Sequence, residues 1–220
     1  MDLCHVDEAG FALTLPTTTT WGAVGCPRRV PYEAPQGRRL NVIGGYFSHG
    51  PLAGEFRFAT FGRVPQPEKR ADGSFGKPLS EVAAEHGLAE EDLGVIDSEV
   101  FLAFVWQLAG RPFDPPEGWR RERPLMVVVD NYSVHKSERV GWERWRLEAA
   151  DVHLVYLPPY SPELSRIETH WKVTKYHDLP QRSYASLGEL KTAVETALAQ
   201  RAIDLRLTRS ESAHSSPRTP

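Results

Sequence analysis

Cysteines and long apolar runs are both scarce in this sequence. Only Cys4 and Cys26 are cysteines among the 220 residues, and their spacing matches no metal or redox motif. No stretch approaches the roughly 18 consecutive apolar residues of a membrane span. The N-terminus also lacks the charged-then-apolar pattern of a secretory signal. We therefore expect a cytoplasmic protein in which Cys4 is a buried free thiol.

An excess of positive charge is missing as well. The chain has 26 lysines and arginines against 29 aspartates and glutamates, which gives a net charge of −3 and a pI near 6.2. This balance argues against a surface coated with basic residues for nucleic acid. A metal site would concentrate carboxylates, however, and would lower the pI without excluding a local basic groove. With 40% hydrophobic residues, the chain has enough apolar side chains for one large domain or two small ones.

Six short segments have the composition of β-strands: residues 3–6, 11–15, 40–47, 55–61, 125–129 and 152–157. Ala9-Gly10 forms a turn signal between the first two segments, so we predict a hairpin there. The third and fourth are predicted to pair with each other. The run LMVVV at 125–129 is apolar on both faces, which is typical of a central strand covered by helices on both sides.

Helical patterns alternate with the later strands. Helices are predicted over residues 79–86, after Asp97-Ser98, over 136–150, after Ser161-Pro162, and over about 185–203. Residues 62–97 are predicted to be a surface insertion with little to anchor it, and residues 205–220 a disordered tail. The element order therefore predicts an α/β domain over residues 1–204.

The helix that follows Ser161-Pro162 carries a notable glutamate. Leu164, Ile167 and Trp171 are spaced at i, i+3 and i+7, so one face of this helix is predicted to be buried. Glu168 lies one step around from that face, close to a strand end. Its carboxylate either takes part in chemistry or pairs with Lys172 at i+4, which contributes only about 0.2–0.5 kcal/mol.

Three carboxylates lie at the ends of elements: Asp7, Asp130 and Glu168. The carboxyl ends of strands are where sites assemble in α/β sheets. Mg²⁺ is bound by a few carboxylates together with waters and substrate phosphates, and two such ions can assist an in-line phosphoryl displacement. Taken singly, Asp7 also fits a turn cap and Asp130 a helix or loop cap. Their joint placement favours a metal site.

The acids lie within three blocks, DEAGF at 7–11, VVVDNYSVHKS at 127–137 and LPPYSPELSRIETHWKVTK at 157–175. Together these blocks resemble the signatures of mariner-type DDE transposases, specifically the bacterial insertion-sequence relatives in the Tc/mariner superfamily. The third block is the most specific, because LPPYSPxL followed by IExxW is a long match. The second combines a DN dipeptide with a histidine four residues later. WGAVG at 21–25 is also similar to a short Trp-Gly loop of that family.

The resemblance implies a ribonuclease H-like fold, which is a mixed five-stranded sheet flanked by helices. It implies that Asp7, Asp130 and Glu168 are the catalytic, metal-binding residues for two Mg²⁺ or Mn²⁺ ions. The implied activity is cleavage of double-stranded DNA at the element ends and strand transfer into a TA target by a homodimer on DNA. A bacterial cytoplasmic protein, associated with the nucleoid when bound to DNA, is the implied setting.

Two departures from the family pattern qualify this expectation. Ser165-Arg166 replaces the usual Asn-Pro pair before Ile167-Glu168, which affects helix entry more than metal binding. The family's N-terminal helix-turn-helix domain has no counterpart here, so a separately encoded DNA-binding part is one expectation. A truncated, non-catalytic remnant or interaction module and a standalone structure-selective nuclease are the alternatives.

Five further residues are candidates for DNA contact: Trp21, His135, Arg166, Lys172 and Lys175. Phosphate contacts dominate DNA affinity, which favours this role for the basic side chains; a solvated helix face is the alternative. Trp21 either stacks on bases or packs against the sheet, and His135 either orients the substrate or is a plain polar residue at a helix start. Glu8 is predicted to point away from Asp7 and to act only in support of it.

Overall fold

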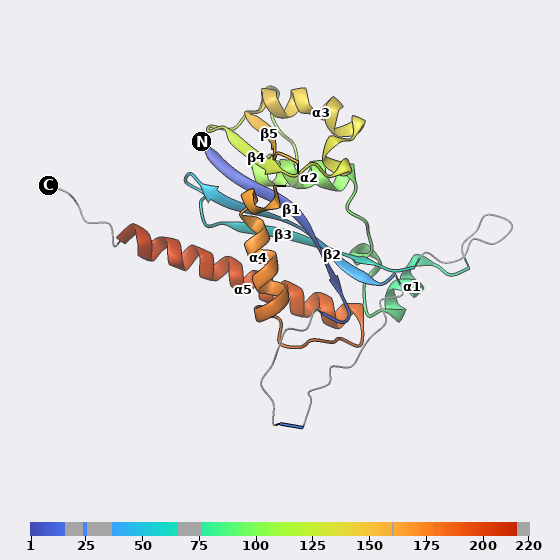
Figure 1. The fold of residues 1–220 in the computed structure, drawn as a ribbon. Helices are drawn as coiled ribbons and strands as arrows, with labels where there is room; N and C mark the ends of the chain where they lie inside the picture. Colours follow the sequence, from blue (N-terminus) through green and yellow to red (C-terminus); the bar gives the residue numbers. More distant parts are fainter. Residues whose placement is uncertain (16–23, 26–36, 66–75, 160, 215–220) are drawn as a thin grey trace.

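The computed structural model describes residues 1–15, 24–25, 37–65, 76–159 and 161–214. Trp21, a candidate DNA contact, lies outside these residues. The described chain forms one mixed five-stranded sheet with helices on both faces (Figure 1). Among the described helices, none is long and apolar enough to cross a membrane.

The sheet has the strand order β3-β2-β1-β4-β5. Strands β1 (Asp2–Ala12), β2 (Arg39–His49) and β3 (Phe56–Arg63) pair in antiparallel fashion, whereas β4 (Leu125–Val129) and β5 (Val152–Tyr156) continue the sheet in parallel with β1. This is the predicted mixed sheet. The prediction that LMVVV forms a central strand is confirmed, because β4 pairs on both sides and three of its five residues are fully buried.

The predicted N-terminal hairpin is wrong, because β1 is a single strand of 11 residues. Its alternation continues without a break through Gly10. Cys4 and Val6 pack into the core on one face, and Ala9 and Phe11 pack into the core on the other. Since β2 pairs with β1 along almost its whole length, the chain has no reason to turn at Gly10.

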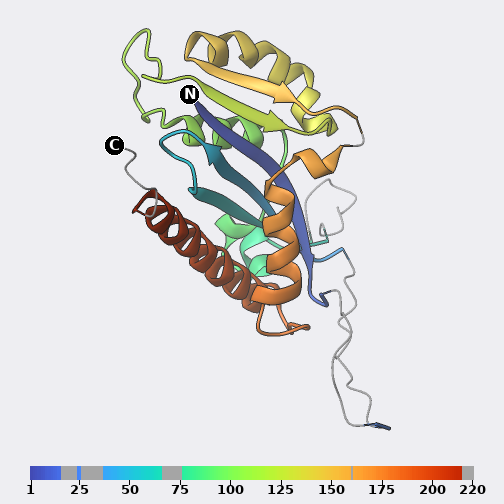
Figure 2. The same cartoon turned by 60° about the vertical axis from the view of Figure 1, so that its left-hand side comes forward.

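Helices cover the two faces separately (Figure 2). One face carries α4 (Ile167–Val173), its π-helical continuation η4 (Thr174–Asp178) and α5 (Leu187–His214), with α1 (Leu79–Glu85) and the short turn η1 (Glu90–Asp92) at the edge of the same core. The other face carries α2 (Ser98–Ala109) and α3 (Glu138–Ala149). The 3₁₀ turns η2 (Ser133–Lys136) and η3 (Pro162–Leu164) lie on the loops that follow β4 and β5.

Several predicted helix boundaries follow from caps that the structure contains. The Asp97 carboxylate accepts hydrogen bonds from the backbone N–H groups of Glu99 and Val100, so α2 begins where the sequence predicts. The Glu189 N–H donates to Ser186 at the start of α5. The prediction for α4 is wrong in detail, because Pro162–Leu164 forms a separate 3₁₀ turn and the α-helix begins only at Ile167.

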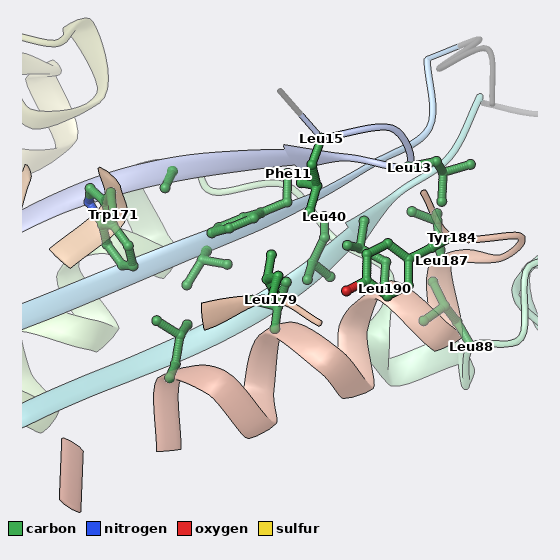
Figure 3. Packing of buried hydrophobic residues seen from close by; sticks show 14 of the residues in the cluster. Phe11, Leu13, Leu15, Leu40, Leu88, Trp171, Leu179, Tyr184, Leu187 and Leu190 are labelled. Carbon is green, nitrogen blue, oxygen red and sulfur yellow. The ribbon is translucent and has the colours of Figure 1, made fainter. Parts of the chain in front are cut away.

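Two further predictions are corrected by the packing. Within the expected insertion 62–97, Val82, Ala83 and Leu88 are buried in the same core as the apolar residues of α5, so this segment is anchored. Figure 3 shows Leu88 among these core residues. The expected tail 205–220 is helical as far as His214, because α5 continues ten residues beyond residue 204. Leu205 packs against the same core, which explains why the helix continues there.

Candidate active site

The parallel pairing of β1 and β4 places the carboxylates of Asp7 and Asp130 at the same level along the sheet. The last paired residues are His5 and Val128. Asp7 follows His5 by two positions within β1, and Asp130 follows Val128 by two positions, just beyond the end of β4. Because side chains alternate with a period of two, the chain fixes both acids at the same height in the sheet. Asn131 then donates a hydrogen bond of 2.6 Å to the Leu157 carbonyl, which ties the end of β4 to the loop after β5.

The third carboxylate, Glu168, is positioned by the close packing of α4 on the sheet. Ile167 and Trp171 are almost completely buried, which leaves Glu168 exposed one step around the helix. Gly44 of β2 makes the approach possible, because a Cβ at this position would lie only 2.5 Å from the Trp171 ring. The Trp171 indole N–H also donates to an Asp7 carboxylate oxygen at 3.1 Å, so the same side chain connects α4 to the site.

Asp7, Asp130 and Glu168 line one pocket of about 330 Å³ between the middle of β1, the end of β4 and the start of α4. The prediction that Asp7 lies at the end of a strand is wrong, because β1 continues to Ala12. Asn131, Tyr132, Ser161 and Ser165 also line it, together with Leu157 and Pro158. Glu168 makes no ion pair with Lys172, nor with any other residue that the structure describes. The alternative in which Glu168 only stabilises its own helix is therefore not supported.

The site has a strongly negative local potential. Burial, and then the neighbouring carboxylates of Glu168, Glu8 and Asp130, raise the pKa of Asp7 from its ordinary value of 3.8 to about 7. The Lys175 ammonium lies close enough to respond to Asp7 and Glu168, but burial is the larger influence and lowers its pKa. A bound cation would relieve the repulsion among these acids.

His135 lies behind the pocket and joins two carboxylates. One ring nitrogen is 2.9 Å from an Asp130 oxygen and the other is 3.0 Å from a Glu8 oxygen. The ring packs against Phe101, and its side chain has no exposed surface. Burial opposes protonation of His135, but Glu8 and Asp130 outweigh it and raise the histidine pKa. The expectation of a DNA contact through His135 is therefore wrong, since the ring is enclosed and orients Asp130 instead.

The carboxylate set fits a divalent metal that takes part of its coordination from water and substrate. Among the described residues, no three histidine, cysteine, aspartate or glutamate side chains are close enough to form a preassembled metal cage. Mg²⁺ does not need such a cage, since it retains waters and binds one or two carboxylates plus phosphates. The Asp130 oxygen Oδ1 accepts from His135 and from the Tyr132 N–H, which leaves Oδ2 without a partner in the described structure.

The remaining predicted residues lie on or beside α4. Arg166 and Lys172 are exposed, whereas Lys175 is half-buried with its ammonium 5.3 Å from the centre of the Phe11 ring. The predicted supporting role of Glu8 agrees with its position on the opposite side of β1 from Asp7. Sequence reasoning missed that Glu8 holds His135 and that Trp171 holds Asp7. The single available signal was the alternation of β1, which places Asp7 and Glu8 on different faces.

Comparisons with known proteins agree with this geometry. Residues 90–191 match the family model described as DDE superfamily endonuclease, a range that contains Asp130 and Glu168. A 66-residue stretch is 32% identical to the insertion element IS630 uncharacterized 39 kDa protein of Shigella sonnei; it covers 30% of this chain and 18% of that protein.

Solved structures of a mariner transposase share the fold. The Mos1 transposase paired-end complex with left transposon end has a TM-score of 0.51 at 13% identity, over 90% of this chain and 47% of that chain. The mariner Mos1 paired end complex with Mg has a TM-score of 0.54 at 14% identity, over 90% and 48%. The chain thus spans about half the length of these structures. Residues 90–191 are thus similar to the DDE superfamily endonucleases, and the chain shares its fold with these mariner transposase structures.

Proposed function

We propose that this domain uses divalent metal ions to cleave DNA phosphodiesters at the ends of an insertion element and to join the resulting 3′-OH to target DNA. The observation that carries the proposal is the meeting of Asp7, Asp130 and Glu168, from three separate elements, around one pocket. Two Mg²⁺ or Mn²⁺ ions bound there would supply Lewis-acid activation of the attacking oxygen and stabilise the leaving oxygen of an in-line displacement.

The protein's own residues would fix the ligands of such a site. Asp7 is held by the Trp171 indole N–H, and Asp130 is held by His135 and the Tyr132 N–H, so each aspartate keeps one orientation. Glu168 has no such support and is exposed, which leaves it able to adjust when substrate enters. Hydrogen-bonding groups that orient a metal ligand in this way typically account for about 10–100-fold in metal affinity or activity.

The DNA would approach over α4 and the loop before it. Arg166 and Lys172 are exposed on this side, and Lys175 lies closer to the carboxylates, so these three basic residues are our candidate phosphate contacts. By family resemblance, the substrate is double-stranded DNA at the element ends, the target is a TA dinucleotide, and a homodimer acts on it. A separately encoded DNA-binding part is a further proposed partner.

The metal site is tested by calorimetric titration of Mn²⁺ and Mg²⁺ into the wild type, Asp130→Asn and Asp114→Asn. Asp114 is an exposed loop carboxylate outside the site and serves as the matched control. We expect Asp130→Asn to abolish specific binding and the control to retain it. No specific binding by the wild type, with or without DNA, would overturn the metal assignment.

Cleavage is tested in the same samples with a supercoiled plasmid. Metal-dependent nicking that disappears in Asp130→Asn would support a domain that is competent by itself. Metal binding without nicking would favour a domain that acts only with its DNA-binding partner. Nicking that persists equally in Asp130→Asn would contradict the catalytic role of the triad.

A further inference from the structure

A second hollow begins at the same acids and continues along the sheet on the side facing α2. It has a volume of about 480 Å³. Asp7, Glu8 and Asp130 line one end, and Arg39, Arg63 and Asn41 line the other. We call this hollow the arginine groove. The arginine groove is thus continuous with the candidate active site. Its near end is negatively charged and its far end is positively charged.

The groove is open because β1 carries no side chain at Gly10. This glycine is exposed and lies opposite Asn41 in the ladder. A Cβ built at Gly10 would meet Arg39 Cδ at 3.9 Å and Asn41 Oδ1 at 4.0 Å, which are ordinary contact distances. The Arg39 side chain therefore reaches back along β1 to Gly10, three residues from Asp7. At about 3.4 Å per residue, this places it roughly 10 Å from the triad.

The polar side chains at the far end of the groove have no hydrogen-bond or ion-pair partners in the described part of the chain. Arg39 and Arg63 are exposed, are opposite one another in the pairing of β2 with β3, and form no ion pair there. Asn41 is only 9% exposed, yet its side chain makes no hydrogen bond to any described residue. Asn41 lines the groove, so its amide is available to hydrogen-bond a ligand there.

The distribution of charge selects the class of ligand. Two guanidinium groups without carboxylate partners favour an anion, and arginine binds phosphate through paired N–H donors. A single small anion would use only the arginine end. A phosphodiester strand would place one phosphate at the triad and another at the arginines, since about 10 Å spans up to three nucleotides at roughly 3.4 Å of helix rise each.

Tyr132 connects the two hollows. It lines both of them and is 52% exposed, so a strand passing from one to the other would meet its ring. Aromatic rings accept bases of any sequence by stacking, and phosphate contacts add affinity without sequence preference.

We propose that the arginine groove binds the backbone of the DNA strand that enters the active site, with Arg39 and Arg63 on a phosphate up to about three nucleotides from the scissile bond. This inference rests on the proposed function, because it assumes that the scissile phosphate lies at the triad.

The test is fluorescence anisotropy with a labelled duplex of about 20 base pairs, at several salt concentrations in EDTA. The variants are Arg39→Gln/Arg63→Gln and the control Arg144→Gln/Arg206→Gln, which removes two exposed arginines of α3 and α5. We expect the first to weaken binding at least tenfold and to lower the slope of log K against log salt by about one, because both arginines contact one phosphate and each neutralised phosphate contributes roughly 0.9. The control should change neither. Equal affinity and slope in wild type and groove variant, or no DNA binding by the wild type, would overturn the inference.

A second variant tests the shape of the groove independently of its charge. A second measurement, metal titration, tests whether a failure belongs to this inference or to the proposed function. Gly10→Val adds bulk to the floor of the groove, where the new Cβ lies at ordinary contact distances. It should weaken binding several-fold while leaving the salt slope unchanged; unchanged affinity would contradict a strand lying over Gly10. Metal titration of the arginine variant should match the wild type. If metal binding fails in every protein while the arginine effect persists, the metal assignment is wrong and the groove stands.

Discussion

Asp7 offers a test in which stability and function change in opposite directions. Its carboxylate is surrounded by Glu8 on β1, Asp130 after β4 and Glu168 on α4, with Lys175 as the nearby cation. Because its pKa is raised from 3.8 to about 7, the folded protein holds a proton there that the unfolded chain has already released. Ionisation of Asp7 therefore opposes folding, and the metal-free protein should lose stability as the pH rises from about 4 to 7.

The size of the effect follows from the pKa values. One pKa unit corresponds to about 1.36 kcal/mol, so the full displacement is worth about 4 kcal/mol above pH 7. Asparagine at this position carries no charge and still offers an oxygen to the Trp171 indole N–H. We therefore expect Asp7→Asn to exceed the wild type in stability by about 4 kcal/mol near pH 8, and by less than about 1 kcal/mol near pH 4.

The measurement is urea unfolding of wild type, Asp7→Asn and the control Asp114→Asn between about pH 4 and pH 8, with EDTA present and m-values compared. Adding Mn²⁺ in place of EDTA should stabilise the wild type in proportion to its binding, and should leave Asp7→Asn nearly unchanged. The reasoning would be refuted if the difference between Asp7→Asn and wild type did not grow with pH, or if the variant were the less stable protein near pH 8.

Three further substitutions probe the supports of the site and of the sheet. Gly44→Ala places a Cβ 2.5 Å from the Trp171 ring; we expect a loss of about 1–3 kcal/mol in urea unfolding and weaker metal binding, and wild-type values for both would show that α4 is not fixed by this contact. His135→Phe keeps a ring in place but removes both carboxylate contacts; metal affinity or nicking should fall about 10–100-fold, and unchanged values for both would contradict a positioning role. Arg121→Met leaves the fully buried Asp2 carboxylate without its cation; thermal and urea unfolding should report a loss of about 3–5 kcal/mol, and a neutral result would mean that this aspartate is compensated elsewhere.

The later half of the chain was the more predictable part of the fold. The central strand 125–129 is apolar on both faces, and only a strand covered on both sides satisfies that pattern. The caps at Asp97 and Ser186 depend on residues a few positions away, so local sequence contains nearly all of the information. The same holds for the order of strand, helix and strand that brings Asp130 and Glu168 toward one end of the sheet.

The wrong predictions concern residues whose local structure depends on a contact with a residue distant in the sequence. Gly10 reads as a turn residue, but pairing with β2 keeps it extended, and the missing side chain opens a groove instead. His135 reads as a plain polar residue at a helix start or as a group that orients the substrate, yet Glu8, 127 positions away in sequence, holds it in the interior. Leu205 reads as the start of a disordered tail, but contact with the core beneath α5 keeps it helical.

The sequence by itself selected Asp7, Asp130 and Glu168 as the candidate site, because strand pattern and motif spacing are local properties. Only the tertiary structure decided how those acids differ. Packing of α4 against Gly44 brings Trp171 to Asp7, and burial beside other carboxylates raises the pKa of Asp7. The physical reason is that desolvation and electrostatic repulsion depend on distances between elements far apart in the chain, which no local pattern contains.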